Sequence, residues 1–331
     1  MTIIRSQSII AASMDDIDDA VDDGCELFAS SRNLQLDQQQ ETAPIHNGND
    51  QTLESAPATA LYSIPTKEPR KFDEAVEQEG CRQIIEALTP QERDDMCDPN
   101  LPLRHFRADK GNIRKAIKRI KYAIQWRKEL KVEEMLKAAH NPTTPQEAET
   151  RNMLMKEAET GKMHVRGYDK DGRAVMYLYQ SRENTWHEEN NVKNLVYSIE
   201  RLIACSKNNN REKSVLVFDF LGWKMKHASS MALTKMTIHI VQECYVERIE
   251  RIYFCNAPAV FRTFFNMVKV FLDPLTKNKV LFLTERDRDK VEEYFDLKTC
   301  EKCLFGTGDL SEYYVYDYFS VPLNVSFDER L

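Results

Sequence analysis

The sequence predicts an α/β protein, in which an N-terminal helical domain precedes a domain built on a mostly parallel β-sheet flanked by helices. Two observations predict this fold class. Past about residue 146, short β-rich runs alternate with longer helical segments, which is the pattern of parallel strands joined by right-handed crossovers. Before that point, the apolar residues recur at helical spacing.

The expected strands are four short runs with helical segments between them. They cover 174–179, 214–220, 252–255 and 280–283, and the helices between them cover 192–207, 229–245 and 258–272. The last three runs are almost continuously apolar, as strands that are buried on both faces should be. No internal sequence repeat accompanies the alternation.

The helical part begins near residue 72. Apolar residues of 76–88 lie along one helical face before Thr89-Pro90 ends the run. A second helix is expected after residue 102, and Asn112 is a good N-cap for a third.

Composition and pattern divide the chain into four segments. Residues 1–70 are rich in polar residues, and 1–60 hold eleven Asp/Glu against two Lys/Arg, so we expect a disordered acidic arm with at most a short helix over 16–28. The helical domain covers 71–145, the sheet domain 146–310 and a C-terminal tail 311–331. The net charge of −7 therefore belongs to the arm, and the folded part is near neutral.

A basic stretch lies in the helical domain. Residues 101–140 hold twelve Lys/Arg and four Asp/Glu, a net charge of +8. Such a stretch is either an ordinary solvated helix surface or a surface for anionic phosphates or lipids.

Several cellular settings are excluded by the sequence. No run approaches the ~20 apolar residues of a membrane-spanning helix. The N-terminal apolar patch is short and is followed at once by Asp15 and Asp16, which makes a poor secretory signal. Eight irregularly placed cysteines in a chain of this length indicate free thiols, and we interpret Cys300 and Cys303 as a coincidence rather than a zinc site. We expect a cytoplasmic protein.

The sequence also lacks the motifs of the enzymes that use parallel sheets. No strand-to-helix turn carries G-x-G-x-x-G or a P-loop, and there is no G-x-S-x-G elbow or H-E-x-x-H. We therefore expect no catalytic residues, no metal, no cofactor and no nucleic-acid partner. An α/β nucleotide-binding enzyme stays open as an alternative.

The segment from 245 to 280 resembles the core of the CRAL-TRIO lipid-binding family, of the phosphatidylinositol-transfer type. The residues that carry the resemblance are Tyr245-Val246-Glu247, the strand ending in Asn256-Ala257-Pro258, a long apolar helix, Phe271-Leu272-Asp273-Pro274 and Lys279-Val280. Supporting matches extend over roughly 80–310. The resemblance implies that an apolar pocket holds one phospholipid, which the protein exchanges or presents at membranes as a peripheral protein.

The helix over 258–272 carries a wide apolar face. Its members at helical spacing are Phe261, Phe264, Phe265, Val268, Phe271 and Leu272. Periodicity alone favours an ordinary core helix. The resemblance implies instead a gate helix whose movement opens the pocket.

Polar residues precede the expected strands and so lie at the amino edge of the sheet. Glu247, Thr276 and Lys279 are such residues. An ammonium donates to a phosphodiester and a carboxylate accepts from sugar hydroxyls, which together suit an inositol phosphate headgroup. The resemblance implies the same three residues and adds Lys110, with Asp109 where the family usually has Arg. The alternative is a solvated ion pair between Glu247 and Lys279.

By the resemblance, the pocket wall includes three more positions. Ser214 matches a hydroxyl that such relatives use for phosphatidylcholine, whereas Met176 and Leu216 replace an expected Tyr and Thr. We therefore expect that any second lipid is not phosphatidylcholine. Two hypotheses stay open: the ligand is wholly apolar, like a tocopherol or retinoid, or the acidic arm binds a partner protein such as a lipid kinase.

Overall fold

A computed structural model of the protein describes residues 72–272 and 274–327, and the expected acidic arm and its helix over 16–28 lie outside the described residues. The helices before the sheet are α3 (Glu74–Glu86), α4 (Pro90–Asp94), α5 (Leu101–Ala108), α6 (Ile113–Glu129), α7 (Val132–His140) and α8 (Pro145–Ala158). The strands are β1 (Met163–Tyr168), β2 (Ala174–Tyr179), β3 (Ser214–Asp219), β4 (Ile249–Cys255) and β5 (Val280–Phe282). The remaining α-helices are α9 (Glu188–Asn208), α10 (Met231–Cys244), α11 (Ala259–Val268), α12 (Pro274–Lys277), α13 (Arg288–Tyr294) and α14 (Val315–Ser320).

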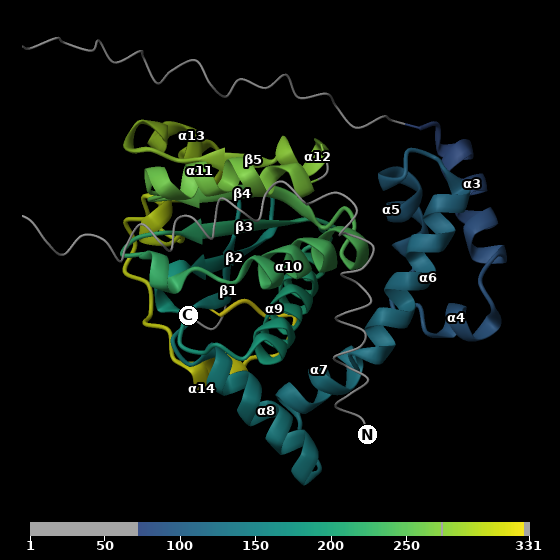
Figure 1. The fold of residues 1–331 in the computed structure, drawn as a ribbon, viewed down its shortest axis with the longest axis horizontal. Coiled ribbons are helices and arrows are strands. Elements are labelled where there is room, and N and C mark those ends of the chain that lie inside the picture. Colours follow the sequence, from purple (N-terminus) through teal and green to yellow (C-terminus); the bar gives the residue numbers. More distant parts are fainter. Residues whose placement is uncertain (1–71, 273, 328–331) are drawn as a thin grey trace, which may run out of the picture. The chain divides into compact units, whose positions relative to one another are not determined.

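Within the described residues the strands form one sheet in the order β1-β2-β3-β4-β5 (Figure 1). Strands β2 to β5 are parallel, and β1 pairs with β2 antiparallel. The expected mostly parallel sheet is confirmed, and all four predicted strands form. Strand β1 escaped prediction because it contains the polar residues His164 and Arg166. Both are buried and bonded internally, His164 to the Gly161 carbonyl and Arg166 to Glu301.

Each face of the sheet has its own apolar core. One face packs under α9, α10 and α11 and includes Met176, Leu216 and Phe254. The other face packs against α13 and the segment 297–305, and it includes Val217 and Tyr253. Alternate residues of each strand point to opposite faces, so a two-sided core requires the continuous apolar runs seen in the sequence.

The helices α3, α5 and α6 share a smaller core. Its buried members are Ile84, Leu88, Phe106, Ala116, Ile120 and Ile124. The Asn112 side chain accepts a hydrogen bond from the Lys115 N–H at 3.1 Å, as expected of an N-cap. Helix α3 approaches α5 so closely that a Cβ at Gly80 would lie 2.3 Å from the Phe106 ring. Glycine is therefore required there.

The segment after residue 311 packs into the larger core. Tyr318 and Phe319 of α14 are buried, and the buried Arg201 of α9 donates to the Tyr318 and Val325 carbonyl oxygens at 2.8 and 3.0 Å. Among the described residues, no helix is both long and apolar enough to cross a membrane.

Candidate functional site

Three charged side chains that are distant in the sequence meet at the amino edge of the sheet. Lys213 directly precedes β3, Lys279 directly precedes β5, and Glu247 lies in the turn before β4. The Glu247 Oε2 atom lies 3.8 Å from the Lys213 Nζ atom and 3.9 Å from the Lys279 Nζ atom. Two ammonium groups therefore flank one carboxylate.

The Glu247 carboxylate is near these cations without being hydrogen-bonded. Both distances exceed the range of about 2.7–3.2 Å for an N–H···O bond. No donor among the described residues bonds this carboxylate, although its side chain is only 17% exposed. A largely buried carboxylate with unused acceptor capacity can accept hydrogen bonds from ligand hydroxyl groups.

The backbone at Glu247 has the left-handed conformation, with φ of 57°. This conformation is uncommon for a residue with a Cβ and costs of order 1–3 kcal/mol. The turn is closed by the Arg248 N–H, which donates to the Tyr245 carbonyl oxygen at 3.3 Å, and both Tyr245 and Val246 are buried. Strained backbone of this kind concentrates at functional sites.

Thr276 and Lys279 lie in the connection between residues 259–271 and β5. Residues 259–271, which comprise α11 and the 3-10 helix after it, are the expected gate and are called the gate segment below. The Lys279 N–H donates to the Thr276 carbonyl oxygen at 3.1 Å, and the Lys279 carbonyl oxygen accepts from the Ile252 N–H at 2.8 Å. These bonds fix the backbone of the connection against β4. They hold the Lys279 side chain beside Glu247, and half-buried Thr276 lies three residues earlier in the same connection.

The N-terminal pair Asp109 and Lys110 is divided between interior and surface. The Asp109 side chain is fully buried, and its Oδ1 atom lies 2.8 Å from Arg119 and 3.4 Å from Lys115. Lys110 is exposed, has φ of 56° and forms no ion pair with the residues that the structure describes. Asp109 is thus a structural partner of α6, and the structure does not join Lys110 to Glu247.

Arg119 connects the helical part to the gate segment. It donates to the Glu243 carboxylate and to the Gln242 carbonyl oxygen of α10, each at 2.7 Å. The Gln242 amide in turn donates to the Phe271 carbonyl oxygen at 3.0 Å. One chain of hydrogen bonds therefore runs from α6 through α10 to the end of the gate segment.

Two cations near Glu247, Lys213 and Arg107, were not predicted from the sequence. Lys213 could have been found, because it precedes a strand as Lys279 does. Arg107, on α5, donates to both carboxylate oxygens of Glu77 at 2.6 Å. The Glu77 hydrogen bond and, more weakly, the charge of Glu247 raise the pKa of Arg107.

Behind the turn, Arg248 belongs to a buried ion cluster. Arg248 and Arg104 both donate to Asp98 and to Glu212. Burial alone would raise the pKa of Asp98, but the two guanidinium groups lower it to about 2. This cluster joins α5 to the start of β4 and uses its charges internally.

Most Lys and Arg side chains of the basic stretch 101–140 form ion pairs with carboxylates of the protein itself. Within the described part of the chain, its ion-paired members are Arg104, Arg107, Lys115, Arg119, Lys121, Arg127, Lys128 and Lys137. The other basic residues, which form no ion pair there, are Lys110, Arg114, Lys118 and Lys131. Any attraction to anionic lipid through this stretch therefore rests on few side chains.

The expected gate helix forms as α11, which continues as a short 3-10 helix over Lys269–Phe271. Its apolar face packs on the sheet: the Phe261 ring centre is 3.9 Å from Phe220, and that of Phe265 is 5.2 Å from Phe254. Val268 is buried, whereas Phe264, Phe271 and Leu272 are half-buried.

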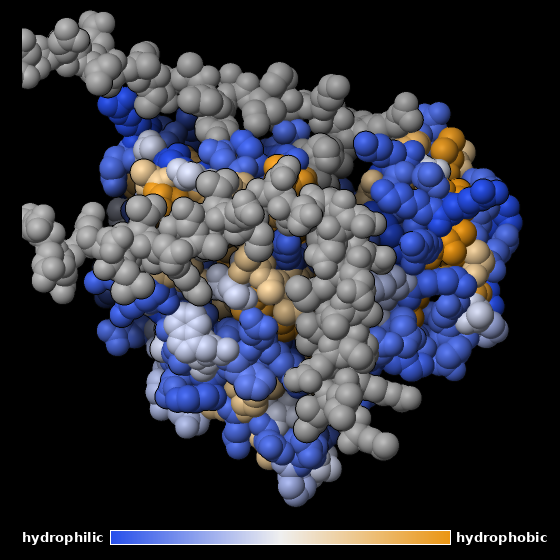
Figure 2. All heavy atoms as spheres, viewed as in Figure 1, coloured by the Kyte–Doolittle hydropathy of each residue, from blue (hydrophilic) through white to orange (hydrophobic). Residues whose placement is uncertain are grey.

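The outer side of this segment is also apolar. Val260 is 50% exposed and Val270 is 66% exposed. Figure 2 shows hydrophobic residues at the surface over α11. In the neighbouring α10, Ile240 alone is fully buried, and apolar side chains such as Leu233 and Met236 stay partly accessible while contacting the core. The helices α10 and α11 that cover this face of the sheet therefore leave apolar side chains partly exposed to solvent.

The three wall positions lie on the sheet face beneath these helices. Met176 and Leu216 pair across β2 and β3 within the larger core. The Ser214 hydroxyl shares a hydrogen bond of 2.8 Å with Ser206, which also accepts from the Ala174 N–H. The Ser214 hydroxyl is thus engaged internally.

The carboxyl edge of the sheet has a separate pocket of about 200 Å³. It is lined by Cys255, Asn256, Ala257, Leu283, Thr284, Glu285, Cys303 and Phe305. Cys303 is hydrogen-bonded to Cys255, and this contact together with burial raises the pKa of Cys303. The lining includes a carboxylate and no cation, so it does not suit a nucleotide phosphate.

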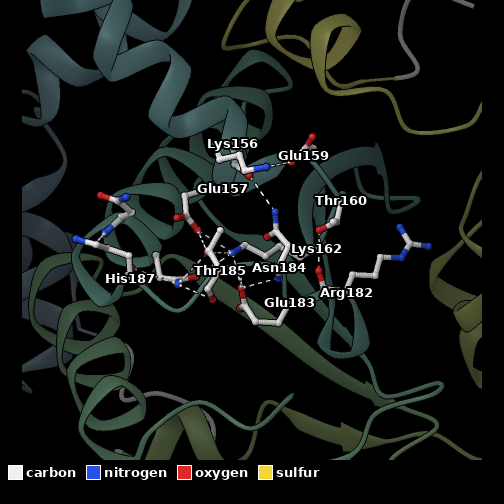
Figure 3. A network of polar contacts seen from close by, with 12 residues as sticks. Lys156, Glu157, Glu159, Thr160, Lys162, Arg182, Glu183, Asn184, Thr185 and His187 are labelled. Atoms are coloured by element: carbon white, nitrogen blue, oxygen red, sulfur yellow. Dashed lines mark hydrogen bonds and ion pairs between the residues drawn. The ribbon is translucent and has the colours of Figure 1, made fainter. Parts of the chain in front are cut away.

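A buried charge network lies near the same edge, where α8, β1 and the loop after β2 meet (Figure 3). The Lys162 ammonium donates to Glu157 at 2.8 Å, to Glu183 at 2.6 Å, to Thr185 at 3.0 Å and to Asn191 at 3.1 Å. Every N–H donor of the Lys162 ammonium is therefore used inside the protein. The network holds the loop after β2 against α8 and β1.

Comparison with known proteins identifies the sheet domain. Residues 158–306 match the model of the CRAL/TRIO domain. The chain is 31% identical over 59% of its length to a CRAL-TRIO domain-containing protein of Schizosaccharomyces pombe, covering 18% of that protein. It is 30% identical over 54% of its length to the phosphatidylinositol transfer protein PDR17 of Saccharomyces cerevisiae, covering 51% of that protein.

A third relative is covered more fully. The SEC14 cytosolic factor of Candida glabrata is 29% identical over 70% of the chain, and 76% of that factor is covered. The chain spans about half or less of the length of the first two relatives.

Proposed function

The protein belongs to the CRAL-TRIO family, and from that premise we propose that it binds one phospholipid, phosphatidylinositol, and exchanges it at membranes through the gate helix α11. The observation that carries the proposal is the Glu247 carboxylate, which lies between two ammonium groups and has no hydrogen bond from the described residues. The similarity to relatives named as phosphatidylinositol transfer proteins supports it.

The chemistry of the cluster matches the two parts of the headgroup. Lys279 donates to the phosphodiester and Glu247 accepts from inositol hydroxyls. Thr276 adds a hydroxyl in the same connection. Lys110, exposed and unpaired among the described residues, enters the site when the headgroup is bound.

Exchange requires a protein pocket because free lipid cannot cross water. Withdrawing a two-chain lipid exposes on the order of 30 methylenes at ~0.8 kcal/mol each, or about 24 kcal/mol. An apolar pocket cancels most of this cost, and the barrier is then the opening of the gate. The exposed Val260 and Val270 lower that barrier at a membrane, because they contact acyl chains instead of water.

The wall positions disfavour phosphatidylcholine as a second ligand. Met176 and Leu216 carry no hydroxyl, and the Ser214 hydroxyl is bonded to Ser206.

Transfer of labelled lipid between vesicles tests the proposal. We expect the protein to move phosphatidylinositol to acceptor vesicles and to leave phosphatidylcholine largely in the donors. Transfer of a tocopherol or retinoid alone would favour the wholly apolar ligand. Binding of a dinucleotide with no lipid transfer would favour the nucleotide enzyme.

A further inference from the structure

We propose that Lys213 is a specificity-determining residue of the headgroup site, which donates to the ligand phosphate together with Lys279. The inference rests on the proposed function and names a residue that neither the sequence motifs nor the resemblance contains. It makes the site selective for lipids that carry a phosphate over neutral lipids with the same chains.

The contacts of Lys213 place its ammonium at the centre of the cluster. Its Nζ atom lies 3.2 Å from Glu250 and 3.8 Å from Glu247, and the side chain is 33% exposed. An ammonium has three donors, and one carboxylate bond leaves the others for a ligand. Lys213 and Lys279 both lie within 4 Å of the same Glu247 oxygen, so both ammonium groups face one region at the amino edge of the sheet.

Glu250 is electrostatically coupled to this lysine. Burial alone would raise the pKa of Glu250, but Lys213 lowers it, with smaller contributions from Arg173 and Lys279. Glu250 is therefore ionised at neutral pH and adds a negative charge to the site.

The charge balance explains why one lysine is insufficient. Glu247 and Glu250 carry two negative charges and Lys213 and Lys279 carry two positive charges, while Arg107 and Arg173 act more weakly on the same carboxylates. Removing Lys213 therefore makes the potential at the phosphate position more negative, which opposes an anionic phosphodiester and leaves the binding of a neutral lipid unaffected.

The alternative is that Lys213 only neutralises Glu250. Loss of a counter-ion would also shift the preference toward the neutral lipid, but Glu250→Gln would then reverse the shift because it removes the charge that Lys213 balances. The ratio of two competing lipids in Lys213→Ala and in the double variant Lys213→Ala/Glu250→Gln therefore separates the two roles, because a lost phosphate donor is not restored by Glu250→Gln.

The test incubates the full chain with vesicles that contain phosphatidylinositol and diacylglycerol with identical acyl chains. After re-isolation of the protein, mass spectrometry measures the ratio of the two bound lipids. We expect Lys213→Ala to shift the ratio about tenfold toward diacylglycerol, because it removes a charge-assisted bond at a partly exposed site. Lys213→Arg should keep the ratio within about twofold of the wild type, because it keeps the charge.

Lys290→Ala is the matched control, because Lys290 is also ion-paired but is 72% exposed and belongs to α13. An unchanged ratio in Lys213→Ala would overturn the inference, whether or not total lipid falls. An equal shift in Lys213→Arg would overturn it as well. If the wild type takes up no phosphatidylinositol, the proposed function itself fails.

Discussion

The Glu247 carboxylate and the Lys279 ammonium lie 3.9 Å apart at the amino edge of β4 and β5. The separation is too long for a hydrogen bond, yet short enough for strong mutual attraction. In a self-sufficient ion pair the two groups would close to hydrogen-bonding distance, as Arg119 and Asp109 do at 2.8 Å. Because no described residue donates a hydrogen bond to the Glu247 carboxylate, the geometry supports the headgroup site that we propose.

Removing Lys279 should impair headgroup recognition and spare the fold. Lys279→Ala deletes one proposed phosphate donor outside the apolar core, and its loss should cost ~2–3 kcal/mol, or roughly 30- to 160-fold in phosphatidylinositol affinity. Glu247→Ala should act in the same direction, and the double variant should lose less than the sum. Vesicle transfer assays measure each effect, with Lys290→Ala as the control. Full transfer by both single variants would contradict the assignment.

Much of the sheet domain was predictable from sequence, because buried parallel strands require long apolar runs. Strand β1 was not predictable, because it contains the buried polar residues His164 and Arg166. Both are paired with Glu301, which lies far along the chain. Local patterns of apolar and polar residues do not reveal ion pairs between residues that are so far apart in the sequence.

Pairing between distant residues also limited what could be predicted about the candidate site. Glu247, Thr276 and Lys279 were predictable from strand order, and Lys213 follows from the same rule. The inward position of Asp109 was not predictable, because it depends on Arg119 of α6 and, through it, on Glu243 of α10. Neither partner is near enough in sequence to mark the pairing.

Asp109→Asn should destabilise the fold. The substitution leaves Arg119 with one carboxylate instead of two, and losing a hydrogen bond between charged groups costs about 1.5–3 kcal/mol. Chemical denaturation should show this loss in the free energy of unfolding. Asp171→Asn is the control, because the Asp171 side chain is 56% exposed, and it should change stability by less than about 1 kcal/mol. Equal effects of the two variants would contradict the structural role of Asp109.

The exposed side of the gate segment should control membrane association. The double variant Val260→Ser and Val270→Ser removes apolar surface that solvent already reaches, so we expect an unchanged melting temperature. Each valine contributes up to about 1.5 kcal/mol when buried in a bilayer, and vesicle sedimentation should detect the loss. Vesicle binding equal to that of the wild type would show that this surface does not contact the membrane.

Stability should fall as the pH drops from about 6.5 to 4. Burial lowers the pKa of His105 to about 4, so the folded protein keeps this ring neutral while the unfolded chain takes up a proton near pH 6.5. The stabilisation is complete above pH 6.5 and is lost as the pH falls through this window, by about 3 kcal/mol.

His140 has the same lowered pKa, of about 4, and adds to the loss. Burial lowers the pKa of His164 as well, so the loss is shared among three rings. The variant His105→Gln should therefore show a smaller pH dependence than the wild type, without abolishing it, when unfolding is followed at pH 4.5 and 7. A stability that does not change with pH in the wild type would contradict neutral burial of these rings.

Mass spectrometry of the lipid extracted from the purified protein tests directly whether the chain binds phosphatidylinositol. We expect about one phospholipid per chain, with phosphatidylinositol enriched over its share of the host membranes and reduced in Lys279→Ala. A protein that purifies free of lipid and takes up none from vesicles, or one that carries phosphatidylinositol equally well after Lys279→Ala and Glu247→Ala, would contradict this expectation.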